Sequence, residues 1–182
     1  MSFGGSLKQS SQLFRRFALF IDGANVYASA KALGWEIDWD KVLVYYRKND
    51  LVRAYYYTAI AEGESRLRPM VDYLAFNGYV LKTKPMKIFR DPVTGVVKEK
   101  GNVDMELALD ALDISEFVTD IVIFTGDGDF RILVERLQQR GVRIHIVSTV
   151  KSDPPMCANE LRAQCDYFVD LQDLQLIFRR DK

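Results

Sequence analysis

Short apolar runs alternate with segments of helical spacing along most of the chain. Apolar, β-branched and aromatic residues predict strands at 17–21, 51–60, from 79 onward, 120–124, 142–147 and 167–169. Helical spacing predicts helices at 23–33, 39–48, 64–76, 103–112 and 130–139, a short helix before residue 167 and a terminal helix from about residue 171. Strands alternating with helices form βαβ crossovers, so this pattern predicts an α/β fold with a mostly parallel central sheet and helices on both faces.

Two segments fall outside this alternation. Residues 82–100 contain the turn signal Asp91-Pro-Val-Thr-Gly95 between two β-prone stretches, which predicts a small protruding β-hairpin. The first residues are rich in Ser, Gly and Gln and predict a flexible N-terminal arm over 1–15. Residues 16–182 are expected to form a single domain, because this length is ordinary for one.

Composition narrows the class of protein. Of the 182 residues, 48% are hydrophobic and 27% are charged, which is typical of a globular protein. No apolar run approaches the ~20 residues that cross a bilayer, and no secretory signal is recognised, so a cytoplasmic protein without a membrane segment is expected. Cys157 and Cys165 match no zinc or redox spacing and are expected to be plain thiols.

A net charge of zero conceals a local asymmetry. Residues 81–100 carry six basic and two acidic groups, a balance of +4, whereas residues 101–182 carry nine and fifteen, a balance of −6. A basic segment beside an acidic one suits a metal-dependent enzyme that acts on a polyanion. Ordinary solvated surface charge is the alternative interpretation.

Acidic residues gather where predicted strands end. Asp22 follows the first strand, and Asp127 and Asp129 follow the strand at 120–124. The carboxyl ends of parallel strands share one edge of the sheet, where ligands bind, so these acids are expected on the same rim. Neighbouring carboxylates repel one another, and a divalent cation is one way to neutralise them. The alternative is that these side chains only cap the helices that follow.

Asp104 is expected to join this rim from the start of a helix. At ~100° per residue it shares a stripe with Leu107, Ala108 and Ala111, which faces the sheet. A carboxylate on that stripe requires a partner, although a favourable interaction with the helix dipole is an alternative. Asp110 lies about 240° round the same helix and is expected to point elsewhere.

Three motifs in order resemble those of the NYN domain family, especially its LabA-like bacterial branch. They are Phe20-Ile-Asp-Gly-Ala-Asn25, Lys100-Gly-Asn-Val-Asp104 and Thr125-Gly-Asp-Gly-Asp-Phe130, and the resemblance spans roughly residues 17–174. That family belongs with the PIN-like nucleases, so the resemblance implies a PIN-like, Rossmann-type fold and cleavage of RNA with Mg²⁺ or Mn²⁺. It also implies that the metal ligands and catalytic residues are Asp22, Asp104, Asp127 and Asp129.

The resemblance extends to residues around the acids. Asn25 matches the family's Asn, and its amide could orient Asp22, contact a phosphate or cap the first helix. Thr125 stands where Ser is common, and Asp110 where LabA-like members often carry an acid. The residues expected to contact RNA are Asn25, Lys84, Lys98, Lys100 and Thr125, and Tyr79 and Phe89 are candidates for base stacking.

Two hypotheses of function follow. The first is a metal-dependent ribonuclease that hydrolyses RNA phosphodiester bonds, and the second is a catalytically weak or inactive RNA-binding regulatory module of the LabA-like type. His145 lies inside an apolar strand, where a hydrogen-bonded core histidine is expected rather than a catalyst. The chain has no Gly-rich dinucleotide fingerprint and no Walker A loop. A homodimer is compatible with the sequence, but no interface is indicated.

Overall fold

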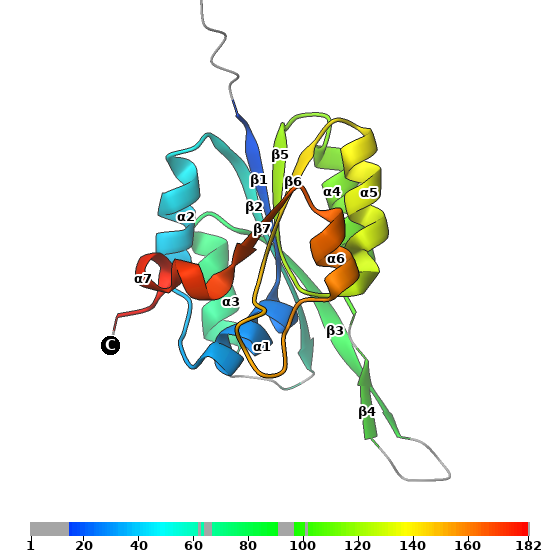
Figure 1. Cartoon of the computed structure of the whole chain (residues 1–182). Coiled ribbons are helices and arrows are strands. Elements are labelled where there is room, and N and C mark those ends of the chain that lie inside the picture. The colour runs from blue at the N-terminus through cyan, green and yellow to red at the C-terminus, as the bar shows by residue number, and fades with distance from the viewer. Residues whose placement is uncertain (1–14, 62, 64–66, 91–96, 101, 182) are drawn as a thin grey trace, which may run out of the picture.

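The computed structural model describes residues 15–61, 63, 67–90, 97–100 and 102–181. Within these residues one sheet has the strand order β4-β3-β2-β1-β5-β6-β7, and every neighbouring pair is parallel except β3 with β4 (Figure 1). The strands are β1 (Phe17–Asp22), β2 (Leu51–Ala61), β3 (Val80–Arg90), β4 (Val97–Lys100), β5 (Asp120–Phe124), β6 (Arg143–Ser148) and β7 (Tyr167–Asp170). The predicted α/β fold with a mostly parallel sheet is confirmed.

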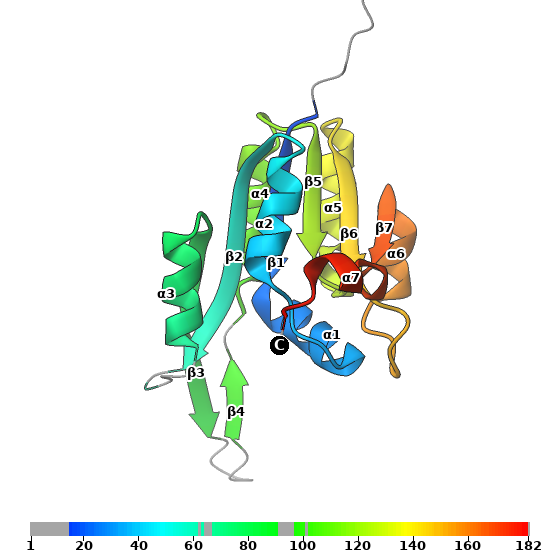
Figure 2. The ribbon, with the colours of Figure 1, turned by 90° about the vertical axis from the view of Figure 1, so that its left-hand side faces the viewer.

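Helices cover both faces of the sheet (Figures 1 and 2). One face carries α1 (Gly23–Leu33), α2 (Trp39–Arg47), α3 (Arg68–Phe76) and α7 (Gln175–Phe178). The other face carries α4 (Asp104–Ile114), α5 (Arg131–Gln139) and α6 (Asn159–Gln164). None of the helices in the described ranges is long and apolar enough to cross a membrane.

The central strands are buried because both of their faces carry apolar side chains. Every residue of β1 and β5 is buried. In β1, Ala18 and Phe20 join the core beneath α4 and α5, whereas Leu19 and Ile21 join the core beneath α2. A strand covered on both sides reads as a continuous apolar run, which explains why the sequence pattern located these two strands.

Several predicted boundaries differ from the structure or lie outside its described part. Two 3₁₀ turns were not predicted, η1 (Gly128–Phe130) and η2 (Leu171–Leu174), and because η2 comes first, the terminal helix begins only at Gln175. Asp170 sets η2, since its carboxylate accepts a hydrogen bond from the Gln172 N–H at 2.9 Å. The predicted arm lies outside the described residues except for Arg15. β3 and β4 pair antiparallel, but the predicted turn at 91–95 is also outside them, so the complete hairpin stays a prediction.

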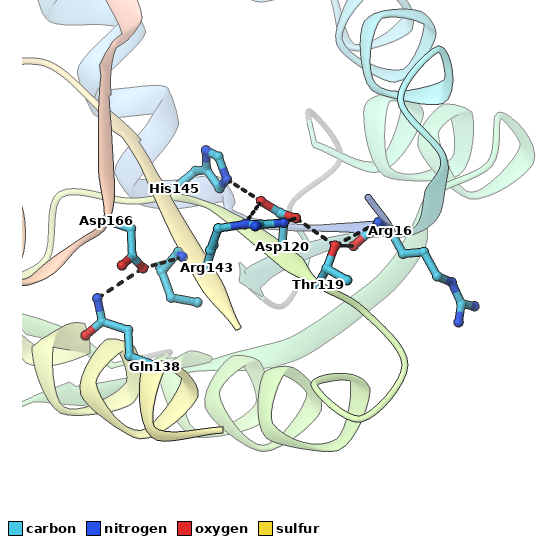
Figure 3. A network of polar contacts seen from close by, with 8 residues as sticks. Arg16, Thr119, Asp120, Gln138, Arg143, His145 and Asp166 are labelled. Carbon is cyan, nitrogen blue, oxygen red and sulfur yellow. Dashed lines mark hydrogen bonds and ion pairs between the residues drawn. The ribbon is translucent and has the colours of Figure 1, made fainter. Parts of the chain in front are cut away.

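A polar network closes the amino ends of β5 and β6 (Figure 3). Asp120 is fully buried, and it accepts hydrogen bonds from Arg143 Nε at 3.0 Å, Arg143 Nη2 at 2.8 Å and Thr119 Oγ1 at 2.7 Å. His145 Nε2 lies 3.0 Å from the same carboxylate, and its ring stacks on Tyr167. His145 is therefore a hydrogen-bonded strand residue, as the sequence indicated.

These contacts set the charge state of Asp120. Burial opposes the charged carboxylate, but the hydrogen bonds from Arg143, His145 and Thr119 outweigh burial and lower the pKa of Asp120 to about 2. The network lies at the end of the sheet opposite Asp22 and therefore stabilises the fold. It is separate from the acidic rim, the name used below for Asp22, Asp104, Asp127 and Asp129.

Candidate functional site

The carboxyl ends of β1 and β5 lie next to each other in the sheet. Ile21 of β1 pairs with Phe124 of β5 in parallel, so Asp22, the last residue of β1, and Thr125, the first residue after β5, come next along the two chains. Residues about one hundred positions apart thus emerge at one rim, as expected for the edge of a parallel sheet.

Asp22 is the most constrained acid of this rim. Its side chain is buried, with the residue only 6% exposed. One carboxylate oxygen accepts a hydrogen bond from the Asn25 N–H at 3.2 Å, and the other accepts one from Thr125 Oγ1 at 3.2 Å. Burial raises the pKa of Asp22 to about 6, and the charges of Asp104 and Asp127 act in the same direction, against the two hydrogen bonds.

The charges of Asp104 and Asp127 act on this buried carboxylate, and the charge of Asp129 acts on Asp104. Asp104 is half-buried at the first residue of α4. Burial raises the pKa of Asp104, opposed by a hydrogen bond from Asn102, and the charges of Asp127, Asp129 and Glu106 raise it further. Each predicted acid therefore lies within electrostatic range of at least one other, as carboxylates on a common rim must.

The capping interpretation also holds for two of the acids. Asp22 caps α1, and Asp127 caps η1 through a hydrogen bond of 3.0 Å from the Asp129 N–H to its Oδ1. A cap fixes where the carboxylate sits without removing its charge. Capping and cation binding are therefore compatible roles for the same side chains.

The donor types at the rim suit a hard divalent cation. Carboxylate oxygens are the ligands that Mg²⁺ and Mn²⁺ prefer, and Mg²⁺ usually takes only one or two of them together with water and phosphate. Among the described residues, no group of three or more His, Cys, Asp or Glu side chains is arranged so that it could hold a metal ion. The acids of the rim thus supply the oxygen donors that the cation prefers, but their side chains are not arranged as a complete set of ligands.

Asn25 and Thr125, which the sequence assigned to RNA contact, are bonded within the rim. Asn25 Oδ1 accepts a hydrogen bond from the Gly126 N–H at 2.9 Å, which ties the start of α1 to the loop after β5. Thr125 is 1% exposed; its hydroxyl donates to Asp22 and accepts from the Asp127 N–H at 3.3 Å. These contacts orient the acids, and contact of either residue with RNA stays a prediction.

Replacing Asn25 with alanine tests this positioning role. The Gly126 N–H loses its acceptor, which is expected to cost about 1 kcal/mol of stability and to weaken Mn²⁺ binding by several-fold. Urea unfolding and Mn²⁺ titration measure the two effects. Asn49→Ala is the control, because Asn49 also bonds a backbone group, the Tyr45 carbonyl, but lies in the turn after α2. Equal Mn²⁺ affinity in the two variants would contradict the positioning role.

Met156 and Glu160, which follow β6, approach the loop that carries Asp127 and Asp129. The sequence did not indicate this contact. A Cβ at Gly126 would lie 1.8 Å from the Met156 carbonyl oxygen, so only glycine fits there. A Cβ at Gly128 would lie 2.6 Å from Glu160 Oε1, which places another carboxylate beside the Asp127 and Asp129 loop. The two glycines of the Gly-Asp-Gly-Asp motif were the only signal of this close approach.

Lys82 and Lys84 of β3 face α4. Lys84 Nζ lies 2.7 Å from Glu106 Oε1, and Lys82 Nζ lies 3.1 Å from Asp110 Oδ2, which also accepts a hydrogen bond from the Tyr57 hydroxyl at 2.8 Å. Asp110 thus holds α4 against β2 and β3 and points elsewhere than the rim, as the helical geometry indicated.

The remaining predicted RNA contacts have different outcomes. The side chains of Lys98, Lys100 and Phe89 lie outside the described part of the structure, so their roles stay predictions. Tyr79 is 4% exposed and donates its hydroxyl hydrogen to the Trp39 carbonyl at 2.7 Å. Packing against α2 buries the Tyr79 ring, so this side chain belongs to the core and is excluded as a candidate for base stacking.

The parallel sheet, with a candidate site at the carboxyl ends of β1 and β5, defines an α/β domain. A model of the NYN domain matches residues 16–172, and the chain belongs to the NYN domain family. It is 35% identical over 164 residues to the low amplitude and bright protein LabA of Synechococcus elongatus, covering 88% of this chain and 86% of that protein. The crystal structure of a protein of unknown function from Vibrio parahaemolyticus is also similar, with a TM-score of 0.73 and 28% identity over 91% of this chain and 96% of that one.

Proposed function

We propose that this protein is a ribonuclease that hydrolyses RNA phosphodiester bonds with Mg²⁺ or Mn²⁺ held at the acidic rim. The observation that carries the proposal is the buried carboxylate of Asp22, whose pKa is raised to about 6 beside Asp104 and Asp127. Such a group is ionised only at a cost in free energy, and a cation removes that cost. When bound, the cation would supply Lewis-acid chemistry for the hydrolysis.

The residues of the rim would have different roles in holding the cation. Asp22 is the fixed anchor, because the Asn25 N–H and the Thr125 hydroxyl hold both of its oxygens. Asp104 and Asp127 would turn toward Asp22 to complete the ligand set. Asp129 is more exposed and would contribute from the solvent side of the rim.

The surface beside the rim offers contacts for a nucleic acid strand. Lys82 and Lys84 are half-exposed and pair with Asp110 and Glu106, so RNA phosphates would compete with these carboxylates for the two lysines. Tyr27 lies two residues beyond Asn25 on α1 and is 68% exposed. Its exposed ring is a candidate for stacking on an unpaired base. The expected substrate is cytoplasmic RNA.

The second candidate is an RNA-binding regulatory module with weak or no catalysis. The observation that favours it is the rim itself, where the described acids are not gathered into a complete cage for a metal ion. The same lysines and the same exposed tyrosine would then bind RNA without cleaving it.

Titration with Mn²⁺ separates the two candidates. For the ribonuclease, Mn²⁺ is expected to raise the melting temperature of the wild-type protein and to switch on cleavage of single-stranded RNA. Asp127→Asn keeps an N-cap for η1 but removes a ligand charge, so both effects should be lost. Stabilisation by Mn²⁺ without cleavage would favour the binding module, and no stabilisation of the wild type would contradict a cation site at the rim.

A further inference from the structure

One side of the molecule carries adjacent apolar side chains that lie open to solvent. The helices α2 and α7 lie side by side (Figures 1 and 2). On α2, Val44 is 52% and Tyr45 is 39% exposed, and on α7 Leu176 is 98% and Ile177 is 43% exposed. Single exposed apolar residues are common on proteins, but a contiguous group of them marks an interaction surface. We call these four residues the α2–α7 patch.

The patch continues onto α3. Tyr73 is 47% exposed and donates a hydrogen bond to Asp40 of α2, and Phe76 is 89% exposed. Apolar side chains are therefore exposed on three helices that cover the same face of the sheet.

The exposed leucine is not needed for the fold. The residue that anchors α7 is Phe178, which is fully buried and packs edge-on against the Tyr45 ring at a centroid distance of 5.4 Å. The carbonyl of Arg179 accepts a hydrogen bond from Lys41 Nζ at 2.9 Å, which fixes the end of the helix on α2. Leu176 instead projects from a helix whose position is already determined.

A shallow, open hollow is lined in part by Ile177, the residue that follows Leu176 on α7. Its volume is about 320 Å³, which is the volume that about ten water molecules occupy in the liquid. Val44, Tyr45 and Ile177 supply its apolar lining. The charged residues around it are Asp38, Asp40, Lys41 and Lys48, two of each sign.

We propose that the α2–α7 patch is the interface of a symmetric homodimer, in which Leu176 of each copy enters the hollow of the other. A projection and a hollow on the same patch make that patch complementary to itself, which is the requirement of a two-fold interface. With Asp181, which pairs with Lys41 at 2.8 Å, the charges around the hollow are three acidic and two basic, so a second copy meets this surface with little net repulsion. The patch shares no residue with the acidic rim, so dimer formation and RNA cleavage can be tested separately.

Sedimentation velocity of the full chain over a range of micromolar concentrations tests this interface. The wild-type protein is expected to dimerise, and Leu176→Asp to raise the dissociation constant at least about 100-fold, because each dimer loses two central apolar contacts. Leu109→Asp is the matched control, since Leu109 is 55% exposed on α4 at the opposite face and its loss should leave the dimer intact.

Three results would overturn the proposal. They are a monomeric wild-type protein across the whole range, a Leu176→Asp variant that dimerises as well as the wild type, and a Leu109→Asp variant that dissociates as much as Leu176→Asp. Circular dichroism of both variants should match the wild type, because both positions are exposed in the monomer. A misfolded Leu176→Asp variant would contradict the conclusion that Phe178, and not Leu176, anchors α7.

Discussion

Replacing Asp22 with asparagine is expected to abolish RNA cleavage and to make the metal-free protein more stable. Cleavage should fall at least about 100-fold, the scale of losing one preorganised electrostatic group. The folded protein raises the pKa of Asp22 from 3.8 to about 6, so ionised Asp22 destabilises the fold at neutral pH. Asparagine carries no charge there and is expected to add about 1–3 kcal/mol in urea unfolding at pH 7.

The same variant has a distinct pH signature. Because the folded state binds the Asp22 proton more tightly than the unfolded state, the contribution of this residue to stability falls as the pH rises from about 4 to about 6. That decline should be absent in the Asp22→Asn protein. Asp113→Asn, on the exposed face of α4, is the control and should change neither cleavage nor this pH dependence. Full activity of Asp22→Asn would refute the role of the rim.

Replacing Asp120 with asparagine is expected to destabilise the protein by about 3 kcal/mol, because it leaves Arg143 and His145 without their charged partner. Asp120 is fully buried and accepts two hydrogen bonds from Arg143. Since the fold lowers the pKa of Asp120 to about 2, the stabilisation is complete above about pH 4 and is lost as the pH falls toward 2. Urea unfolding at neutral and acid pH measures both effects.

The exposed pair of Arg131 and Glu135 provides the comparison for Asp120. These side chains lie 3.5 Å apart on α5 and are 42% and 45% exposed. Glu135→Gln should cost less than about 1 kcal/mol, because solvent screens an exposed ion pair. An Asp120→Asn protein no less stable than Glu135→Gln would show that the buried network contributes little to the fold.

The sequence pattern located elements well where burial alone determined which residues are apolar. β1 and β5 are continuous apolar runs because both of their faces are covered, and no other element produces that pattern at such short length. The order of the strands was not predictable, because it depends on which crossovers pack on which face. The start of α7 was misplaced because the Asp170 side chain imposes a 3₁₀ turn that leaves no periodic signal.

The acids of the rim were predictable for a related reason. Asp22 and Asp127 follow strands that end at the same edge, and Asp104 lies on the stripe of α4 that faces the core. Which atoms they contact was not predictable, since that depends on side-chain direction. Asn25 faces Gly126, and Glu160 approaches the Gly128 loop only because α6 packs against it.

Charge counting alone overstated the free positive charge near the rim. Lys82 and Lys84 belong to the most basic segment of the chain, yet each is paired with a carboxylate of α4 more than twenty positions away. Those partners belong to the acidic segment that follows, so the positive charges of these two lysines are neutralised locally in the folded protein. RNA affinity is accordingly expected to depend on salt and on Glu106 and Asp110 as well as on the lysines.

Anomalous diffraction from a crystal soaked in Mn²⁺ shows directly whether a cation binds at the acidic rim. An anomalous peak is expected there, within ligand distance of an Asp22 oxygen, about 2.0–2.2 Å, with Asp104 or Asp127 turned toward the ion. A peak elsewhere on the protein, or none at a saturating Mn²⁺ concentration, would contradict this expectation.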